Sequence, residues 1–125
     1  MRAVLDTSVL IGADVPEGVE GAISAASLAE LYFGTLVALD PDERAHRVQR
    51  LGAIEAAFDP LPVDAAVARE WGKLAAGVAR RGGKPRRRTM DLVIAATANA
   101  AGVPLLTTNL KDFAIIDDLV DVRLP

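Results

Sequence analysis

The sequence predicts an α/β protein in which a mostly parallel sheet is flanked by helices. Strand-like and helical segments alternate along all 125 residues, with no internal repeat or low-complexity tract between them. Apolar residues make up 51% of the chain, which is enough for a hydrophobic core and argues against disorder. A single domain covering residues 1–125 is therefore expected.

The first half of the chain is expected to contain two short strands and two long helices. Ala3–Leu5 has the composition of a buried strand and is followed by a short turn of helix and the loop ADVPEGVEG. A second short strand is expected at Ala22–Ala25. Ser27–Leu39 and Pro41–Phe58 have helical patterns, and Pro41 suits the first turn of the second helix.

The second half continues the alternation. Leu61–Val63 lies where a third strand is expected, and 65–81 has a helical pattern that places Trp71 on the core-facing side. The segment TMDLVIAATANAAG is apolar almost all round and predicts a buried central helix, with Thr89 as its N-cap and Gly102 as its C-cap.

The C-terminal segment completes the predicted sheet. Val103–Thr108 is expected to form a fourth strand, 109–113 a loop, and 121–124 an edge strand. In a sheet of parallel strands, ligands bind at the carboxyl ends of the strands. Polar residues that directly follow a predicted strand are therefore the candidates for a functional site.

Composition excludes several kinds of chemistry. The chain has no cysteine, which excludes disulfides, thiolate metal sites and cysteine nucleophiles. Its one histidine, His46, lies among charged residues of a predicted helix and is expected to face solvent. No apolar run approaches the roughly 18 residues of a membrane span, and the N-terminus lacks a secretory signal pattern, so a cytoplasmic protein is expected.

Four acidic residues lie after predicted strands or near predicted helix starts: Asp6, Glu30, Asp91 and Asp112. Each also has an ordinary structural explanation. Asp6 could begin a turn, Ser27 and Glu30 fit the spacing of a capping box, and an acid in a first turn such as Asp91 is favoured by the helix dipole. Their shared location at one edge of the sheet favours a common site.

A cluster of carboxylates is costly unless the groups are protonated or bind a cation, because like charges raise one another's pKa. Oxygen-only ligands favour a hard divalent cation, either Mg²⁺ or Mn²⁺. Such an ion can activate water and stabilise charge on a phosphodiester. Asp6 and Asp91, with Glu30 and Asp112 as further candidates, are the expected ligands. The hydroxyls of Thr7, Ser8 and Thr107 could orient them.

The net charge of −3 conceals a basic segment. The stretch RRGGKPRRR holds six of the 14 lysines and arginines and directly precedes the helix that carries Asp91. Lys84, Arg86, Arg87 and Arg88 are candidates for binding a nucleic-acid backbone. A solvated linker between two helices is the alternative explanation.

These motifs resemble the PIN-domain nucleases, and most closely the VapC-type toxins of bacterial toxin-antitoxin pairs. The resemblance runs through VLDTSVLI, ISAASLAELYFG and TMDLVIAATANAAGVPLLTTNLKDF in that order. It implies a three-layer, Rossmann-like PIN domain and RNA cleavage dependent on Mg²⁺ or Mn²⁺. It also implies inhibition by a cognate VapB-type antitoxin and a toxin homodimer, with a larger toxin-antitoxin hetero-oligomer as a further option.

By motif position, Asp6, Glu30 and Asp91 correspond to the acidic metal-site residues of that family. The element TTNLKDF points to Asp112 as the fourth catalytic acid, while Asn109 is a candidate for the same pocket. The stretch between Asp6 and the second predicted strand is shorter than in many family members.

The helix predicted at 27–39 carries more apolar residues than one core-facing stripe needs. Tyr32 and Phe33 are therefore expected to contribute to an antitoxin or dimer surface, unless the whole helix is buried within the monomer. Two other functions remain open: a receiver-like phosphoacceptor domain, which also builds an acidic Mg²⁺ pocket, and a PIN-fold module that binds partners without cleavage.

Overall fold

The computed structural model describes residues 1–125 and contains a four-stranded sheet in which all neighbouring strands are parallel. The strands are β1 (Arg2–Leu5), β2 (Glu20–Ala22), β3 (Leu105–Leu106) and β4 (Val122–Arg123), in the order β2-β1-β3-β4. The chain builds β2 on one side of β1 and β3 on the other. The order therefore reverses at β1, which is where parallel sheets open a ligand crevice.

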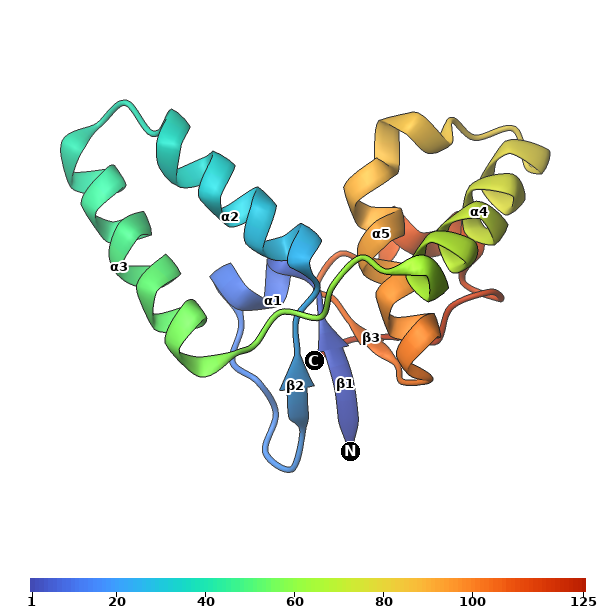
Figure 1. Ribbon diagram of the computed structural model, residues 1–125, viewed down its shortest axis with the longest axis horizontal. Helices are drawn as coiled ribbons and strands as arrows, with labels where there is room; N and C mark the ends of the chain where they lie inside the picture. The colour runs from blue at the N-terminus through green and yellow to red at the C-terminus, as the bar shows by residue number, and fades with distance from the viewer.

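Helices form two arms above this sheet (Figure 1). One arm contains α2 (Ala25–Val37) and α3 (Pro41–Ala57), with the short α1 (Thr7–Gly12) at its base. The other contains α4 (Ala65–Arg80), α5 (Thr89–Ala101) and the 3-10 helix η1 (Pro85–Arg88), while a second 3-10 helix, η2 (Leu110–Ile116), follows β3. The carboxyl ends of β1 and β2 point into the space between the arms.

The sheet separates two hydrophobic cores. Successive residues of β1 contribute to opposite sides: Ala3 and Leu5 join the core shared with α1, α2 and α3, whereas Val4 joins the core shared with α4, α5 and η2. Leu105 and Leu106 divide between the two cores in the same way. This alternation follows from the two-residue period of a strand, and burial of both faces explains why these strands are continuously apolar.

Helix α5 is the buried central helix that the sequence predicts. It has six fully buried residues and packs against α4, α2 and β1. Gly102 ends it with a φ of 69°, a left-handed conformation that glycine adopts without steric cost. The expected N-cap at Thr89 is wrong: Arg88 occupies the cap position, and the Thr89 hydroxyl donates back to the Arg86 carbonyl.

The boundary between β2 and α2 lies earlier than expected. The strand covers Glu20–Ala22 instead of 22–25, and α2 begins at Ala25. Ser24 is the N-cap, and its hydroxyl accepts a hydrogen bond from the Ala26 N–H at 3.1 Å. The sequence contains two serines three residues apart, either of which can cap a helix, so composition alone does not select Ser24.

Two other expectations are wrong in detail. The strand expected at 61–63 is reduced to one parallel bridge between Leu61 and Ser24, because the rest of the segment leaves the sheet to enter α4. The loop expected at 109–113 is the start of η2, which buries Phe113 and Ile116. The edge strand expected at 121–124 is confirmed, although β4 has only two residues.

Two predicted side-chain environments are confirmed. His46 is exposed on α3, and Trp71 is partly buried against the core between α4 and α5. No helix combines the length and the apolar character that crossing a membrane requires.

Candidate functional site

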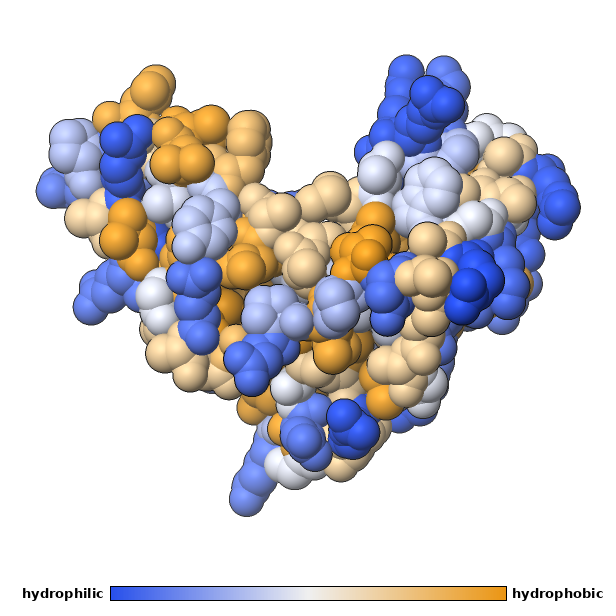
Figure 2. Space-filling view, in the orientation of Figure 1, coloured by the Kyte–Doolittle hydropathy of each residue, from blue (hydrophilic) through white to orange (hydrophobic).

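The candidate site lies at the carboxyl edge of the sheet, below the hollow between the two arms (Figure 2). Asp6 directly follows β1, and Thr107 directly follows β3, the strand hydrogen-bonded to β1. Glu30 enters from α2 and Asp91 from the first turn of α5. Residues far apart in sequence are thus brought to one place by the parallel topology.

Asp6 is held by hydroxyl groups and does not cap α1. Although it occupies the N-cap position, its side chain makes no capping bond. Its Oδ2 atom instead accepts hydrogen bonds from Ser8 Oγ at 2.7 Å and Thr107 Oγ1 at 2.8 Å. The Asp6 side chain is almost completely buried, yet Oδ1 accepts no hydrogen bond from the protein. Oδ2 is therefore held in place by the two hydroxyl groups, while Oδ1 is available to bind a ligand.

The hydroxyl network extends into the loop after β3. Ser8 Oγ lies 3.2 Å from Thr107 Oγ1 and accepts a bond from the Thr108 N–H at 3.1 Å. Thr107 Oγ1 also accepts from the Asn109 N–H at 3.0 Å. These contacts fix the loop to the end of β1, so the proposed orienting role of Ser8 and Thr107 has a direct structural basis.

Glu30 is not part of a capping box. Ser27, its supposed partner, lies inside α2 and is fully buried, since the cap is Ser24. The Thr7 hydroxyl donates to Glu30 Oε1 at 2.8 Å and lies 3.1 Å from Ser27 Oγ. Glu30 is therefore directed toward the end of β1 and the start of α1, where it lies on the same side as Asp6.

Asp91 shows most directly that the acids lie together. Its side chain is half-buried, and burial is the largest factor that raises its pKa from 3.8 to about 6. The negative charges of Asp6, Glu30 and Asp112 raise the pKa further, in that order, while Arg88 lowers it. The other three predicted acids therefore lie near enough to Asp91 for their charges to act on it. Asp91 accepts no hydrogen bond that would offset this repulsion.

Asp112 and Asn109 lie on the outer side of the cluster, and both are exposed. Asn109 occupies the cap position of η2, where its carbonyl accepts a hydrogen bond from the Asp112 N–H. Arg88 donates from its guanidinium to the main-chain carbonyl of Asp112, which connects η1 to η2. The charge of Asp112 reaches Asp91, whereas no contact of the Asn109 side chain with the cluster is present.

The donor set suits a hard divalent cation. Every side chain at the edge offers oxygen, and no cysteine or buried histidine is nearby. No three of the acidic side chains converge closely enough to hold one ion directly. This arrangement fits Mg²⁺, which takes one or two carboxylates directly and keeps several of its waters.

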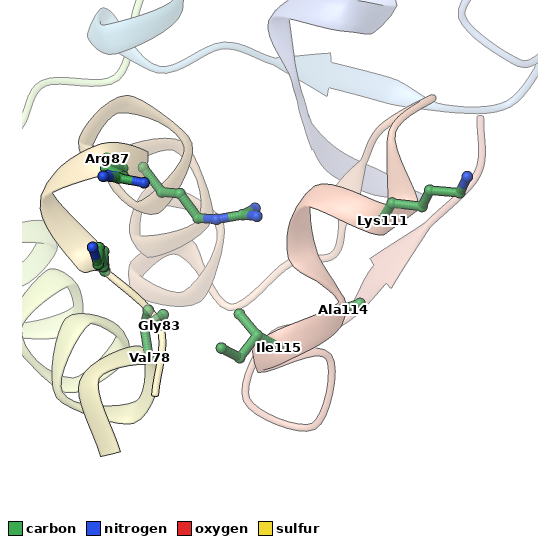
Figure 3. A pocket seen from close by; sticks show the side chains of 8 residues that line it. Val78, Gly83, Arg87, Lys111, Ala114 and Ile115 are labelled. Carbon is green, nitrogen blue, oxygen red and sulfur yellow. The ribbon is translucent and has the colours of Figure 1, made fainter. Parts of the chain in front are cut away.

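The predicted basic and apolar residues also occupy defined positions. Lys84 precedes η1, and Arg86, Arg87 and Arg88 lie within it. Tyr32 and Phe33 are 43% and 68% exposed on α2, so the helix is not wholly buried in the monomer. Sequence reasoning missed Lys111, which lies on η2 and lines a hollow together with Lys84, Arg87 and Arg88 (Figure 3), because 109–113 was expected to be a loop.

Comparison with known proteins defines the class. A family model described as PIN domain matches residues 3–119. The chain belongs to the PIN domain family. This membership supports the nuclease family over the receiver-like alternative, and it confirms the expected parallel fold.

Within that family, the similar proteins are VapC ribonucleases. Ribonuclease VapC5 of Mycobacterium tuberculosis is 37% identical over 130 residues, covering 97% of this chain and 92% of the relative. Ribonuclease VapC4 of the same organism is 35% identical, covering 94% and 93%. A chain of the solved VapBC-5 toxin-antitoxin structure from M. tuberculosis superposes with a TM-score of 0.83 and covers 98% of this chain and 96% of that chain.

Proposed function

We propose that this protein is a metal-dependent endoribonuclease and the toxin of a toxin-antitoxin pair. The observation that carries the proposal is that Asp6, Glu30 and Asp112 lie close enough to Asp91, at the ligand-binding edge of the sheet, for their charges to raise its pKa. Clustered carboxylates raise one another's pKa, and a bound divalent cation would compensate their charge. The names of the two ribonuclease relatives supply the reaction class.

Asp6 and Asp91 are the proposed direct metal ligands, and Glu30 and Asp112 bind through water or hold a second ion. When bound, Mg²⁺ or Mn²⁺ supplies an activated water and stabilises charge on the cleaved phosphodiester. Ser8 and Thr107 fix the orientation of Asp6, and Thr7 fixes that of Glu30. One carboxylate of the cluster is the proposed acceptor of the proton from the attacking water.

The proposed partners follow from the same relatives. The similar solved structure is a toxin-antitoxin complex, so we propose a cognate VapB-type antitoxin for this chain. The apolar side chains exposed on the α2–α3 arm, including Tyr32 and Phe33, form the proposed surface for an antitoxin or a second copy of the toxin. Figure 2 shows apolar side chains gathered at the tip of this arm.

The test combines metal binding with RNA cleavage. Mn²⁺ is titrated calorimetrically into purified, antitoxin-free protein, and cleavage of total RNA is followed with Mn²⁺, with Mg²⁺ and with EDTA. Wild-type protein is expected to bind the metal and to cut RNA only when it is present. Asp91→Asn is expected to lose both properties while keeping its circular dichroism spectrum.

Asp42→Asn is a matched control, because Asp42 also lies in the first turn of a helix but is exposed on α3, away from the cluster. It is expected to behave as wild type. Cleavage that persists in EDTA, or an active Asp91→Asn protein, would contradict the proposed mechanism. A wild-type protein that neither binds metal nor cuts RNA would favour the catalytically silent binding module.

A further inference from the structure

The hydroxyl of Ser27 is buried inside α2 and takes no part in capping the helix. Ser24 occupies the cap position, and the Ser27 side chain is completely shielded from solvent. Its oxygen has a single hydrogen-bond partner, the Thr7 hydroxyl at 3.1 Å. Serine has no advantage over alanine inside a helix, so this contact is what the Ser27 hydroxyl provides.

The Thr7 hydroxyl has two polar neighbours but only one hydrogen. It lies 2.8 Å from Glu30 Oε1 and 3.1 Å from Ser27 Oγ. An ionised carboxylate can only accept hydrogen bonds, so the Thr7 hydrogen is directed to Glu30. The Thr7 oxygen still has lone pairs, and the Ser27 hydrogen is directed to it. This assignment gives each hydroxyl hydrogen an acceptor and makes a one-way chain from Ser27 through Thr7 to Glu30.

The positions of the three residues favour such a chain. Ser27 and Glu30 are three residues apart on α2, so they lie on the same face of the helix in successive turns. Thr7 begins α1, directly after Asp6, and its hydroxyl contacts both residues from outside α2. If the Thr7 side chain rotated away, the buried Ser27 hydroxyl would lose its only partner, which is costly. Ser27 therefore restricts the orientation of Thr7.

We propose that Ser27 is a positioning residue for Glu30 and acts through Thr7. The Ser27 hydroxyl fixes the Thr7 side chain in the orientation that holds Glu30 Oε1 toward the end of β1. The inference rests on the proposed metal-dependent function, because a well-oriented Glu30 contributes more to binding the metal or its waters.

Calorimetric titration of Mn²⁺ into the purified protein measures the effect of Ser27→Ala, with circular dichroism to establish that the variant is folded. The metal affinity is expected to fall about threefold to tenfold, less than for a direct partner of a metal ligand, because Thr7 keeps its bond to Glu30. In the Thr7→Val background the same change should alter the affinity by no more than about twofold, since the connection to Glu30 is already lost.

Thr35→Val is the matched control. Thr35 is also buried on α2, but its hydroxyl donates to the Leu31 carbonyl of the same helix at 2.8 Å. Its Mn²⁺ affinity is expected to stay within about twofold of wild type, because Thr35 shares no partner with Glu30. Equal losses of affinity in Ser27→Ala and Thr35→Val would indicate a general loosening of α2 and would overturn the inference.

Urea unfolding in EDTA tests the same chain of hydroxyls without metal. Ser27→Ala should lower the free energy of unfolding of the wild-type protein. It should not lower that of Thr7→Val, in which the buried Ser27 hydroxyl has already lost its partner. Equal effects of Ser27→Ala in the two backgrounds would show that Ser27 does not act through Thr7.

The two measurements separate this inference from the proposed function. If the wild-type protein binds Mn²⁺ and cuts RNA but Ser27→Ala binds Mn²⁺ equally well, the inference is wrong and the metal-dependent function stands. If the wild-type protein neither binds metal nor cuts RNA, yet the effect of Ser27→Ala on unfolding depends on Thr7, Ser27 still orients Glu30 and the proposed function is wrong.

Discussion

At the scale of single residues, Asp91 experiences two opposing effects. Its position in the first turn of α5 favours a negative charge through the helix dipole. Burial and three neighbouring carboxylates disfavour the same charge and raise its pKa to about 6. The second effect exceeds the first, so this carboxylate weakens the metal-free fold at neutral pH.

Asp91→Asn is therefore expected to stabilise the metal-free protein near pH 7.5. Between pH 3.8 and about 6 the folded state binds more protons than the unfolded state, so the free energy of unfolding falls as pH rises through this range. Removing the charge should restore about 1 kcal/mol at pH 7.5, after discounting for the screening of a half-buried group by water. The gain should largely disappear near pH 4.5.

Urea unfolding in EDTA at the two pH values measures this difference. Asp42→Asn again serves as the control, because it removes a first-turn acid without removing any repulsion. An Asp91→Asn protein less stable than the Asp42→Asn protein at pH 7.5 would show that the cluster is not strained by its own charge.

Thr107 supplies a second prediction at this scale. Its buried hydroxyl donates to Asp6 and accepts from the Asn109 N–H. Thr107→Val keeps the shape but removes both bonds and the contact with Ser8 Oγ, and it should cost about 1–2 kcal/mol of stability. Because Asp6 then keeps only the hydrogen bond from Ser8, its orientation is weakened and affinity for Mn²⁺ should fall about tenfold.

Calorimetric titration of Mn²⁺ checks this effect against Thr108→Val. Thr108 is the exposed neighbour, and its hydroxyl makes no hydrogen bond. Equal metal affinity in the two variants would remove the orienting role assigned to Thr107.

Much of the site is predictable from sequence, because a parallel sheet places the residues that follow its strands at one edge. Asp6 and Thr107 could be assigned in this way from the apolar runs before them. The contact between Arg88 and the Asp112 carbonyl, and the position of Lys111 beside η1, could not be predicted from the sequence. They depend on the direction in which η1 and η2 leave their neighbouring elements, which no local pattern records.

At the scale of elements, the start of α2 is determined by which of two serines caps the helix. Ser24 caps the helix, accepts a bond from the Thr97 hydroxyl and is tied to Leu61 by a bridge. Ser24→Ala should therefore lower the free energy of unfolding by about 1 kcal/mol. Ser27→Ala should cost less, since alanine is well accommodated inside a helix.

Urea denaturation of the two variants provides the comparison. A larger loss of unfolding free energy for Ser27→Ala than for Ser24→Ala would indicate that Ser27 is the N-cap. It would then support the capping-box explanation of Glu30. This boundary was not predictable because tertiary contacts to Leu61 and Thr97, which lie far along the chain, select between two suitable serines. By contrast, α5 was predictable because its all-round apolar surface has no other stable location.

At the scale of the whole molecule, the α2–α3 arm is only partly covered. Phe33, Leu36 and Leu39 are 68%, 70% and 95% exposed; the first two lie on the last turns of α2, and Leu39 follows the end of the helix. Exposed apolar side chains gathered in one region are typical of interaction surfaces. The Tyr32 hydroxyl, bonded to Glu55 on α3, holds the two helices together beside them.

Replacing Tyr32 and Phe33 with serine is expected to shift the purified protein toward monomer or to prevent its complex with the proposed antitoxin. Size-exclusion chromatography with light scattering measures both outcomes. Val15→Ser with Val63→Ser removes exposed apolar surface from loops elsewhere and should leave assembly unchanged. Unaltered assembly in a soluble Tyr32 and Phe33 variant would show that the partner binds elsewhere.

The separation of the interior into two cores has a further consequence. Glu30 belongs to the half built around α2, and Asp91 belongs to the half built around α5, with Asp6 on the strand between them. An ion held by these acids would link the two halves of the molecule. Occupancy would then raise the melting temperature through mass action. It would also slow amide hydrogen exchange in both halves together. Substrate cleavage and the stability of the fold would then depend on the same carboxylate oxygens.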